Sequence, residues 1–292
     1  MGAALRWTIG AALLVALIAW VQRSVGWGAV FAAWQHIPPA DLVAIIALTF
    51  AGYVARAARI AVHFSGPLRE SPLRCFRLMA LHNVANNFLP MRTGELSFPL
   101  LLKQEFGIAP SRSVGALLWL RALDLGAVFV AAAWSLGIHG LGWLAGGAIG
   151  LLGLILPAVV FRILSVTPVH GDGLLARLAS GLPVSGASMV QGQALTVVHW
   201  GMKLAAWAWL LSSLGGIEPV LAWTGAVAGE LTSVLPIHGI AGAGTYEAGV
   251  VLVLSPLGVA TDSALIAAAD LHLFLLGFSL LVAGLSWLFI RR

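Results

Sequence analysis

Six long stretches of almost uninterrupted apolar residues limit what this chain can fold into. A helix that crosses a membrane needs about 20 consecutive apolar residues. Inside the hydrocarbon core every backbone amide must be bonded within its own segment, so such stretches form helices. The sequence therefore predicts an all-α polytopic membrane protein with about six transmembrane helices, at 7–25, 42–64, 114–137, 141–161, 194–214 and 263–290.

Charged residues make up 9% of the 292 residues, and hydrophobic residues make up 60%. A soluble domain carries about 25% charged residues because its surface must stay wetted, so a soluble protein of this length is excluded. The single cysteine, Cys75, excludes an intrachain disulfide and disfavours a metal or redox centre. The basic residues flank apolar stretches, which is typical of an orientation signal. We expect no nucleic-acid partner, no metal and no cofactor.

Basic residues gather in alternate connections between the predicted helices. Most of them lie in 56–77, 103–112, 162–177 and the C-terminal end, whereas the connections 26–39 and 137–140 contain none. Because Lys and Arg favour cytoplasmic loops, we predict that both termini are cytoplasmic, in a bacterial inner membrane.

Two further apolar regions, 75–103 and 223–256, are broken at their centres by proline, glycine and charged residues. Irregular backbone at membrane depth is tolerated only where protein or a water-filled cavity surrounds it. We interpret both regions as re-entrant helical hairpins, which enter and leave the membrane on the same side.

The two breaks resemble each other and indicate an internal repeat. Leu89 and Leu235 each precede a proline and are 146 positions apart (235 − 89), and Asp124 and Asp270 are separated by the same number (270 − 124). Three crossings in each half would place the second half upside down in the membrane, as in transporters whose sites form between discontinuous helices. We predict one transmembrane domain, 1–292, with a first repeat at 1–140 and an inverted second repeat at 141–292.

Ionisable residues inside membrane helices cost about 3 kcal/mol on insertion scales, so they mark functional sites or buried pairs. Arg121 and Asp124 are three positions apart on one helix face and can pair. Lys203 either faces a cavity or pairs with Glu230. The histidines within the apolar segments are interpreted as packing residues. The predicted substrate-binding residues are Asn86, Asn87, Arg92, Glu95, Arg121, Asp124, Lys203, Glu230, His238, Tyr246, Glu247 and Asp270.

Arg92 lies at the first break, where a new helix is expected to begin at Gly94 with Thr93 as its N-cap. The free N–H groups and positive dipole end of such a helix, together with Arg92, would bind an anion such as a lipid phosphate. The second break has a similar arrangement around Gly244, with His238 in the place of Arg92. The alternative is that the glycines only permit a tight turn.

The motif N-x-x-L-P-x-R-x-G-E at Asn86–Glu95, followed by Arg121-x-x-Asp124, resembles the transmembrane domain of lysylphosphatidylglycerol synthetase/flippase proteins. The later pattern from Leu235 to Glu247 is similar to the second signature of that family, although His238 and a longer glycine stretch replace the more usual Pro-Gly-Gly. The resemblance covers essentially the whole chain and implies a lipid-translocating module. Bifunctional members carry an aminoacyl-transferase domain after the membrane part; the chain stops at Arg292, so we expect no aminoacylation of lipid.

We therefore expect a flippase, not an enzyme, that moves a phosphate-bearing or anionic lipid through a cavity between the hairpins. Two alternatives stay open: a membrane-embedded lipid-modifying transferase, and a non-catalytic scaffold of a lipid-biosynthesis pathway. The lack of an Asp-rich metal motif or a nucleophile motif disfavours the transferase. The expected partners are membrane lipids, further copies of the chain, or lipid-biosynthesis enzymes.

Overall fold

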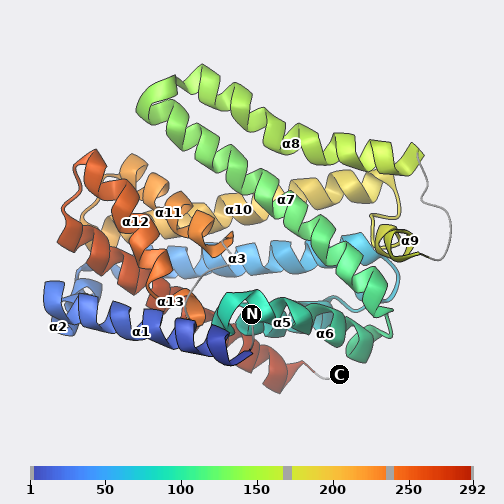
Figure 1. Ribbon diagram of the computed structural model, residues 1–292, viewed down its shortest axis with the longest axis horizontal. Coiled ribbons are helices and arrows are strands. Elements are labelled where there is room, and N and C mark those ends of the chain that lie inside the picture. The colour runs from blue at the N-terminus through green and yellow to red at the C-terminus, as the bar shows by residue number, and fades with distance from the viewer. Residues whose placement is uncertain (1–2, 167–172, 235–239, 291–292) are drawn as a thin grey trace. The chain divides into compact units, whose positions relative to one another are not determined.

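The protein is described by a computed structural model that covers residues 3–166, 173–234 and 240–290 (Figure 1). These residues form helices joined by turns and short connections, with no strand among them, as the sequence predicts. The chain divides into two compact units. Unit 1 comprises 1–50, 83–94 and 202–282, and unit 2 comprises 51–82, 95–201 and 283–292.

Long apolar helices confirm a multi-pass membrane protein. Within the described residues, six helical segments are long and apolar enough to cross a membrane. The sixth, Ile240–Leu257, lies in the second predicted hairpin, and the span predicted at 7–25 instead belongs to a bent pair, Ala11–Ser24 and Trp27–His36, with an angle of 83°. The five that overlap predicted spans are Pro39–Phe64, Pro110–Leu141, Trp143–Val166, Gly186–Gly215 and Thr261–Phe289.

Unit 1 combines helices from both ends of the chain. In this unit, α11 and α12 pack against each other. Gly229 of α11 leaves room for the ring of Tyr246 on α12, because a Cβ at Gly229 would lie 2.6 Å from the ring carbon Cζ. Its N-terminal elements are α1 (Ala3–Ser24), α2 (Trp27–Ala33), η1 (Trp34–His36) and the start of α3 (Pro39–Phe64). Its C-terminal elements are the end of α10 (Gly186–Gly215), α11 (Pro219–Val234), η4 (Ile240–Gly242), α12 (Thr245–Leu254), η5 (Ser255–Leu257) and most of α13 (Thr261–Phe289).

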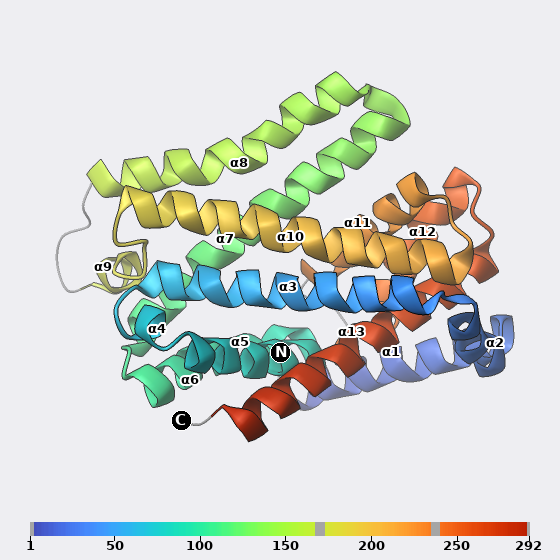
Figure 2. The same ribbon diagram turned by 180° about the vertical axis from the view of Figure 1, so that it is seen from behind.

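Unit 2 contains an antiparallel pair of long helices, α7 and α8 (Figures 1 and 2). A Cβ at Gly126 of α7 would overlap the carbonyl of Gly153 on α8, so only glycine allows this close approach. The parts of α3 and α10 in this unit lie side by side (Figure 2). The remaining elements of the unit are α4 (Pro67–Glu70), most of α5 (Pro72–Phe88), α6 (Ser97–Phe106), α7 (Pro110–Leu136), η3 (Gly137–Leu141), α8 (Trp143–Val166) and α9 (Leu174–Ala179).

Both predicted hairpins consist of two helices separated by a break. The 3-10 helix η2 (Pro90–Leu96) separates α5 from α6, and the segment 235–244, of which 235–239 lie outside the described residues, separates α11 from α12. The helices α6 and α12 have 10 residues each. The α6 helix is therefore about 15 Å long, half of the roughly 30 Å hydrocarbon core, whereas α12 together with η4 and η5 forms the 18-residue segment Ile240–Leu257. Their re-entrant course through a membrane stays a prediction.

The backbone at the two breaks adopts conformations that are unusual for residues other than glycine. Arg92 and Ala241 both have φ of 57°, a region that ordinary residues occupy at a cost. The predicted N-cap at Thr93 is wrong, because the 3-10 helix continues past it and α6 begins at Ser97. The Thr93 hydroxyl instead donates a hydrogen bond to the carbonyl of Pro90 at 2.9 Å.

The helix boundaries follow the 146-residue spacing found in the sequence. Shifting α5 by 146 positions gives 218–234, and α11 spans 219–234. Shifting α6 gives 243–252, and α12 spans 245–254. The same shift relates α3 to α10 within five positions at each end. The same shift also maps parts of unit 2 onto unit 1. Residues 51–82 map to 197–228 and residues 95–136 map to 241–282, and both of the resulting ranges lie largely within unit 1.

Candidate functional site

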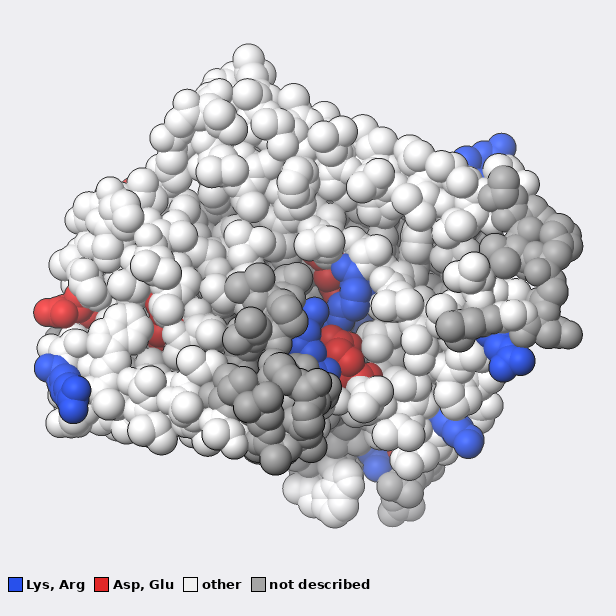
Figure 3. Space-filling view, in the orientation of Figure 1, with Lys and Arg blue, Asp and Glu red and all other residues white. Residues whose placement is uncertain are grey.

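Buried ionisable side chains form several groups, such as Arg77 with Glu105 in unit 2, and two of these groups contain predicted site residues, one within each unit. Figure 3 shows a largely uncharged surface on which Lys, Arg, Asp and Glu are confined to a few positions. We call the group around Asp124 in unit 2 the Asp124 network and the group around Glu247 in unit 1 the Glu247 network. Each is built from helices that bury it in apolar surroundings.

Asp124 of α7 accepts hydrogen bonds from several side chains. Arg59 of α3 contacts both carboxylate oxygens, with Nη1 2.5 Å from Oδ1 and Nη2 3.3 Å from Oδ2. Arg121, one turn earlier on α7, donates to Oδ2 at 3.1 Å, which confirms the predicted pair. The indole N–H of Trp200 on α10 donates to Oδ1 at 2.9 Å, and Thr196 on the same helix accepts a hydrogen bond from Arg59 at 3.1 Å.

Arg121 joins a second carboxylate to this network. Its Nη2 lies 2.7 Å from Oε1 of Glu95, the residue that closes the first motif. The other oxygen of Glu95 lies 3.9 Å from Nε2 of His82, whose Nδ1 is hydrogen-bonded to the Ser97 hydroxyl at 2.8 Å. Arg121 therefore bridges the two carboxylates, with one of its nitrogens on each.

The Asp124 network carries an excess of positive charge. Arg56, one turn before Arg59 on α3, interacts electrostatically with both Arg121 and Asp124. Three arginines against the carboxylates of Glu95 and Asp124 leave a formal charge of +1 (3 − 2) with His82 neutral. A buried group with this sign attracts an anion.

Glu247 is the centre of the network in unit 1. It occupies the first turn of α12, where Oε2 accepts the backbone N–H of Gly244 at 2.8 Å. Its other oxygen, Oε1, lies 2.6 Å from Nδ1 of His272 on α13, and Nε2 of the same imidazole donates to the carbonyl of Ala241 at 2.7 Å. The Tyr246 ring lies 4.9 Å from the His272 ring, centroid to centroid.

Two further buried carboxylates lie in unit 1. Glu230 of α11 accepts from Lys203 at 2.7 Å, so of the two alternatives for this lysine the structure supports the pair. The ammonium group also lies 4.2 Å from the centroid of the Trp207 ring. Asp270 of α13 accepts from the indole of Trp34 at 2.6 Å, and its other oxygen is buried with no hydrogen-bond partner among the described residues.

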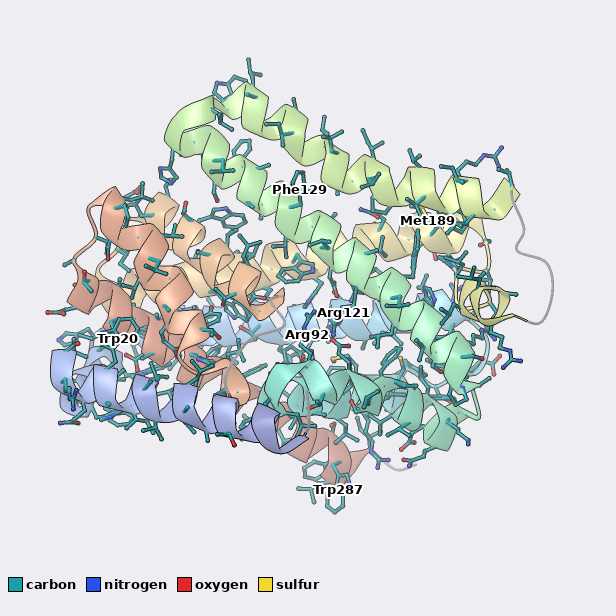
Figure 4. All side chains as sticks on the ribbon, viewed as in Figure 1. Trp20, Arg92, Arg121, Phe129, Met189 and Trp287 are labelled. Carbon is teal, nitrogen blue, oxygen red and sulfur yellow. The ribbon has the colours of Figure 1, made fainter. Side chains whose placement is uncertain are left out.

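The structure places the predicted residues in both units. Glu95, Arg121 and Asp124 meet in the Asp124 network, and Tyr246 and Glu247 meet in the Glu247 network. Arg92, labelled with Arg121 in Figure 4, is partly buried at the first break. His238 lies outside the described residues. The other predicted residues in unit 1 are Asn86, Asn87, Lys203, Glu230 and Asp270.

Several of the contacting residues are not among those predicted from the sequence. Arg59 was assigned to a basic connection, which is wrong: it lies within α3 with 2% of its surface exposed. Its position inside a predicted span was the signal that could have identified it. His272 was interpreted as a packing residue whose hydrogen bonds are satisfied, but its pairing with Glu247 was not predicted. Trp34 and Trp200 carry no sequence signal that distinguishes them from the other tryptophans.

The comparison with protein families gives one match. Residues 7–283 match the family described as the lysylphosphatidylglycerol synthase TM region. No curated protein and no solved structure matches the chain. Among the described residues, no group of three or more His, Cys, Asp or Glu side chains is arranged to hold a metal ion. Since the match covers nearly the whole chain, the protein belongs to the family of the lysylphosphatidylglycerol synthase transmembrane region.

Proposed function

We propose that this protein is a lipid flippase of a bacterial inner membrane, which moves an anionic, phosphate-bearing lipid between the leaflets. The observation that carries the proposal is the Asp124 network, in which arginines and carboxylates are buried on apolar helices. Such groups are costly in a membrane unless they serve a polar pathway or each other. A lipid headgroup is the polar group that a membrane transporter of this family has to accommodate.

The sign of the network favours an anionic headgroup. Arg121 is shared between two carboxylates, so a phosphate that enters can compete for its guanidinium. Arginine binds phosphate with two parallel hydrogen bonds, which fixes the orientation of the headgroup. The formal excess of one positive charge would be neutralised by one phosphate. The acyl chains would remain in the surrounding lipid.

The internal repeat supports a transport role rather than catalysis. The helix boundaries of the two halves follow one spacing of 146 residues, as an inverted repeat with two broken hairpins requires. Transporters with inverted repeats alternate between two openings by moving one part against another. In this proposal both termini are cytoplasmic and the two hairpins open to opposite sides.

The test is translocation of headgroup-labelled lipids in liposomes that contain the purified protein. The panel comprises phosphatidylglycerol, aminoacylated phosphatidylglycerol, a polyprenyl phosphate and an uncharged glycolipid. We expect a phosphate-bearing lipid to move faster than the uncharged one. Glu95→Gln should slow this movement by about tenfold or more, the effect of roughly 1.4 kcal/mol, because it removes the carboxylate that holds Arg121.

Glu70→Gln is the matched control, because it makes the same change at an exposed position of α4 and should leave the rate unchanged. Equal rates for all lipids, or a Glu95→Gln protein as fast as the control, would contradict the proposal. Mass spectrometry of the recovered lipids tests the transferase alternative. A covalently altered lipid that forms only with the protein would favour that alternative.

A further inference from the structure

The hydrogen bonds of His272 determine how many protons the Glu247 network holds. A carbonyl oxygen only accepts hydrogen bonds, so Nε2, which lies 2.7 Å from the Ala241 carbonyl, must carry a hydrogen. Nδ1 lies 2.6 Å from Oε1 of Glu247. At that distance two lone pairs would repel each other, so one further hydrogen lies between the two atoms.

The charge of this pair therefore depends on one shared proton. With the proton, the pair is neutral, either as imidazolium with carboxylate or as imidazole with carboxylic acid. Without it, the pair carries one negative charge in a site where Glu247 is 1% exposed and His272 is 5% exposed. An unpaired charge in such surroundings is costly. Loss of the proton would thus break the contact between the two side chains.

The other titratable groups around the pair do not replace the shared proton. The carboxylate of Glu230 on α11 acts electrostatically on both His272 and Tyr246, and it is itself paired with Lys203 at 2.7 Å. Tyr246 lies against the imidazole, and its buried hydroxyl has no hydrogen-bond partner among the described residues. Asp270, two positions before His272, bonds to Trp34.

The α1 helix also packs against this site. It approaches through the backbone of Leu13, which would contact a Cβ placed at Gly244. The ionisable residues within Ala3–Ser24 are Arg6 and Arg23 near its two ends. Arginine stays charged at every physiological pH, so the described part of α1 brings no titratable group to this site.

A pair on the matching helices of unit 2, although its residues are not 146 positions from Glu247 and His272, has a fixed cation. There Glu95, at the break of the first hairpin, pairs with Arg121 of α7. In unit 1 Glu247, after the break of the second hairpin, pairs with His272 of α13. A 146-position shift of α7 gives 256–282. Most of this range lies within α13, and the rest lies directly before it. The two pairs thus have a similar plan, with a permanent cation in one and a titratable group in the other.

We propose that the His272–Glu247 pair is the proton-binding site that couples lipid movement to proton movement across the membrane. This proposal rests on the proposed flippase function and supplies its energy source. With the shared proton, α13 holds both α12, through Glu247, and the strained backbone at Ala241. When the proton leaves, Glu247 and with it the start of α12 are released from Nδ1 of His272, while Nε2 of the neutral imidazole still donates to the carbonyl of Ala241.

The first experiment measures lipid asymmetry driven by a pH difference. The protein is reconstituted into liposomes with a trapped pH dye, the membrane potential is clamped to zero, and a difference of one pH unit is imposed. If one proton moves per lipid, this difference supports up to about a tenfold asymmetry of the labelled lipid, since each corresponds to roughly 1.4 kcal/mol. The dye should report proton flow that accompanies lipid movement.

Glu247→Gln removes the titratable carboxyl but keeps a donor for Nδ1 and an acceptor for Gly244. It should abolish both the asymmetry and the proton flow. Glu218→Gln, the same change at an exposed position at the start of α11, should keep both at the wild-type level. Lipid movement by the wild type without any pH-driven asymmetry would overturn the coupling while the flippase function stands. Failure of the wild type to move any lipid would instead contradict the proposed function.

A second measurement tests the pair without transport. Amide hydrogen exchange of 240–247 is followed in detergent across pH and corrected for the intrinsic exchange rate. In the wild type the corrected exchange should rise steeply, by about tenfold or more, over a narrow pH interval as the shared proton leaves, and in Glu247→Gln this step should be absent. Exchange with no such step in the wild type, or with the same step in Glu247→Gln, would overturn the assignment of the pair.

Discussion

In unit 2, the carboxylate of Asp124 accepts hydrogen bonds from side chains on three helices. Arg59 and Arg121 neutralise it, and Trp200 completes its hydrogen bonds. A buried pair of this kind contributes little net stability compared with apolar residues, but removal of one partner leaves the other charge uncompensated. Replacement of Asp124 alone should therefore lower the free energy of unfolding more than replacement of both Arg59 and Asp124.

Asp124→Asn should lower the free energy of unfolding by about 3–5 kcal/mol, because it leaves the buried guanidinium of Arg59 without its anion. Unfolding in mixed detergent micelles measures this change. The double variant Arg59→Leu, Asp124→Leu should recover much of the loss, since Arg121 still pairs with Glu95. A double variant as unstable as the single one would contradict a role for the uncompensated charge.

At this scale the sequence predicts contacts within one helix more firmly than contacts between helices, such as Lys203–Glu230, which it offers as one of two alternatives. The Arg121–Asp124 pair follows from a spacing of three positions. Arg59 is 65 positions from Asp124 and Trp200 is 76 positions from it, so only the packing of α3, α7 and α10 brings them together. Likewise, the sequence identifies Glu247 as buried and ionisable, while its partner on α13 depends on the fold.

The first hairpin turns back tightly because of one glycine. Gly94 in η2 packs against the end of α5, where a Cβ would overlap the carbonyl of Ala85 and the Cα of Asn86. Both neighbours are backbone atoms and cannot move aside without a shift of α5. The glycine in the first motif therefore has a steric role, in addition to any contact that the motif makes with a ligand.

Gly94→Ala should lower the free energy of unfolding by about 1–3 kcal/mol, the usual cost of inserting a methyl group into a packed site. Gly201→Ala is its control, because a Cβ at Gly201 in α10 meets nothing within 4 Å. That change should be neutral or stabilising by up to about 1 kcal/mol, since alanine favours helices. Thermal unfolding in detergent compares the two variants. Equal stability would argue against the steric role of Gly94.

Periodicity and composition predict where helices lie better than how they begin and bend. Five predicted spans overlap long apolar helices. The bend after α1 occurs at Gly26, whose φ is 77°, and the sequence offers many similar glycines. The N-cap at Thr93 is wrong because a threonine hydroxyl can satisfy a backbone carbonyl as readily as it caps a helix.

For the whole molecule, the inverted repeat that we propose predicts that equivalent positions face opposite sides of the membrane. Gln35 and Ser180 are both exposed and are 145 positions apart (180 − 35), one fewer than the repeat spacing. In a Cys75→Ala background, a membrane-impermeant maleimide added to spheroplasts should label Gln35→Cys. It should label Ser180→Cys only after the membrane is opened. Labelling of both from the same side would contradict the inversion.

The basic connections in the sequence predict how the whole molecule is oriented in the membrane. The repeat adds an independent constraint on that orientation. The 146-residue spacing was detectable in the sequence from Leu89 with Leu235 and from Asp124 with Asp270. The helix boundaries extend it to α5 with α11 and to α6 with α12.

The glycine contacts between α7 and α8 also have a mechanical consequence. At Gly126 and Gly153 the two backbones approach each other directly, because neither residue has a side chain. The helices α7 and α8 should therefore move together as one rigid body. Arg121 and Asp124 lie on α7 within about one and a half turns of Gly126. A force that the lipid bilayer applies to the exposed surface of α8 would therefore displace the buried charges on α7 together with α8.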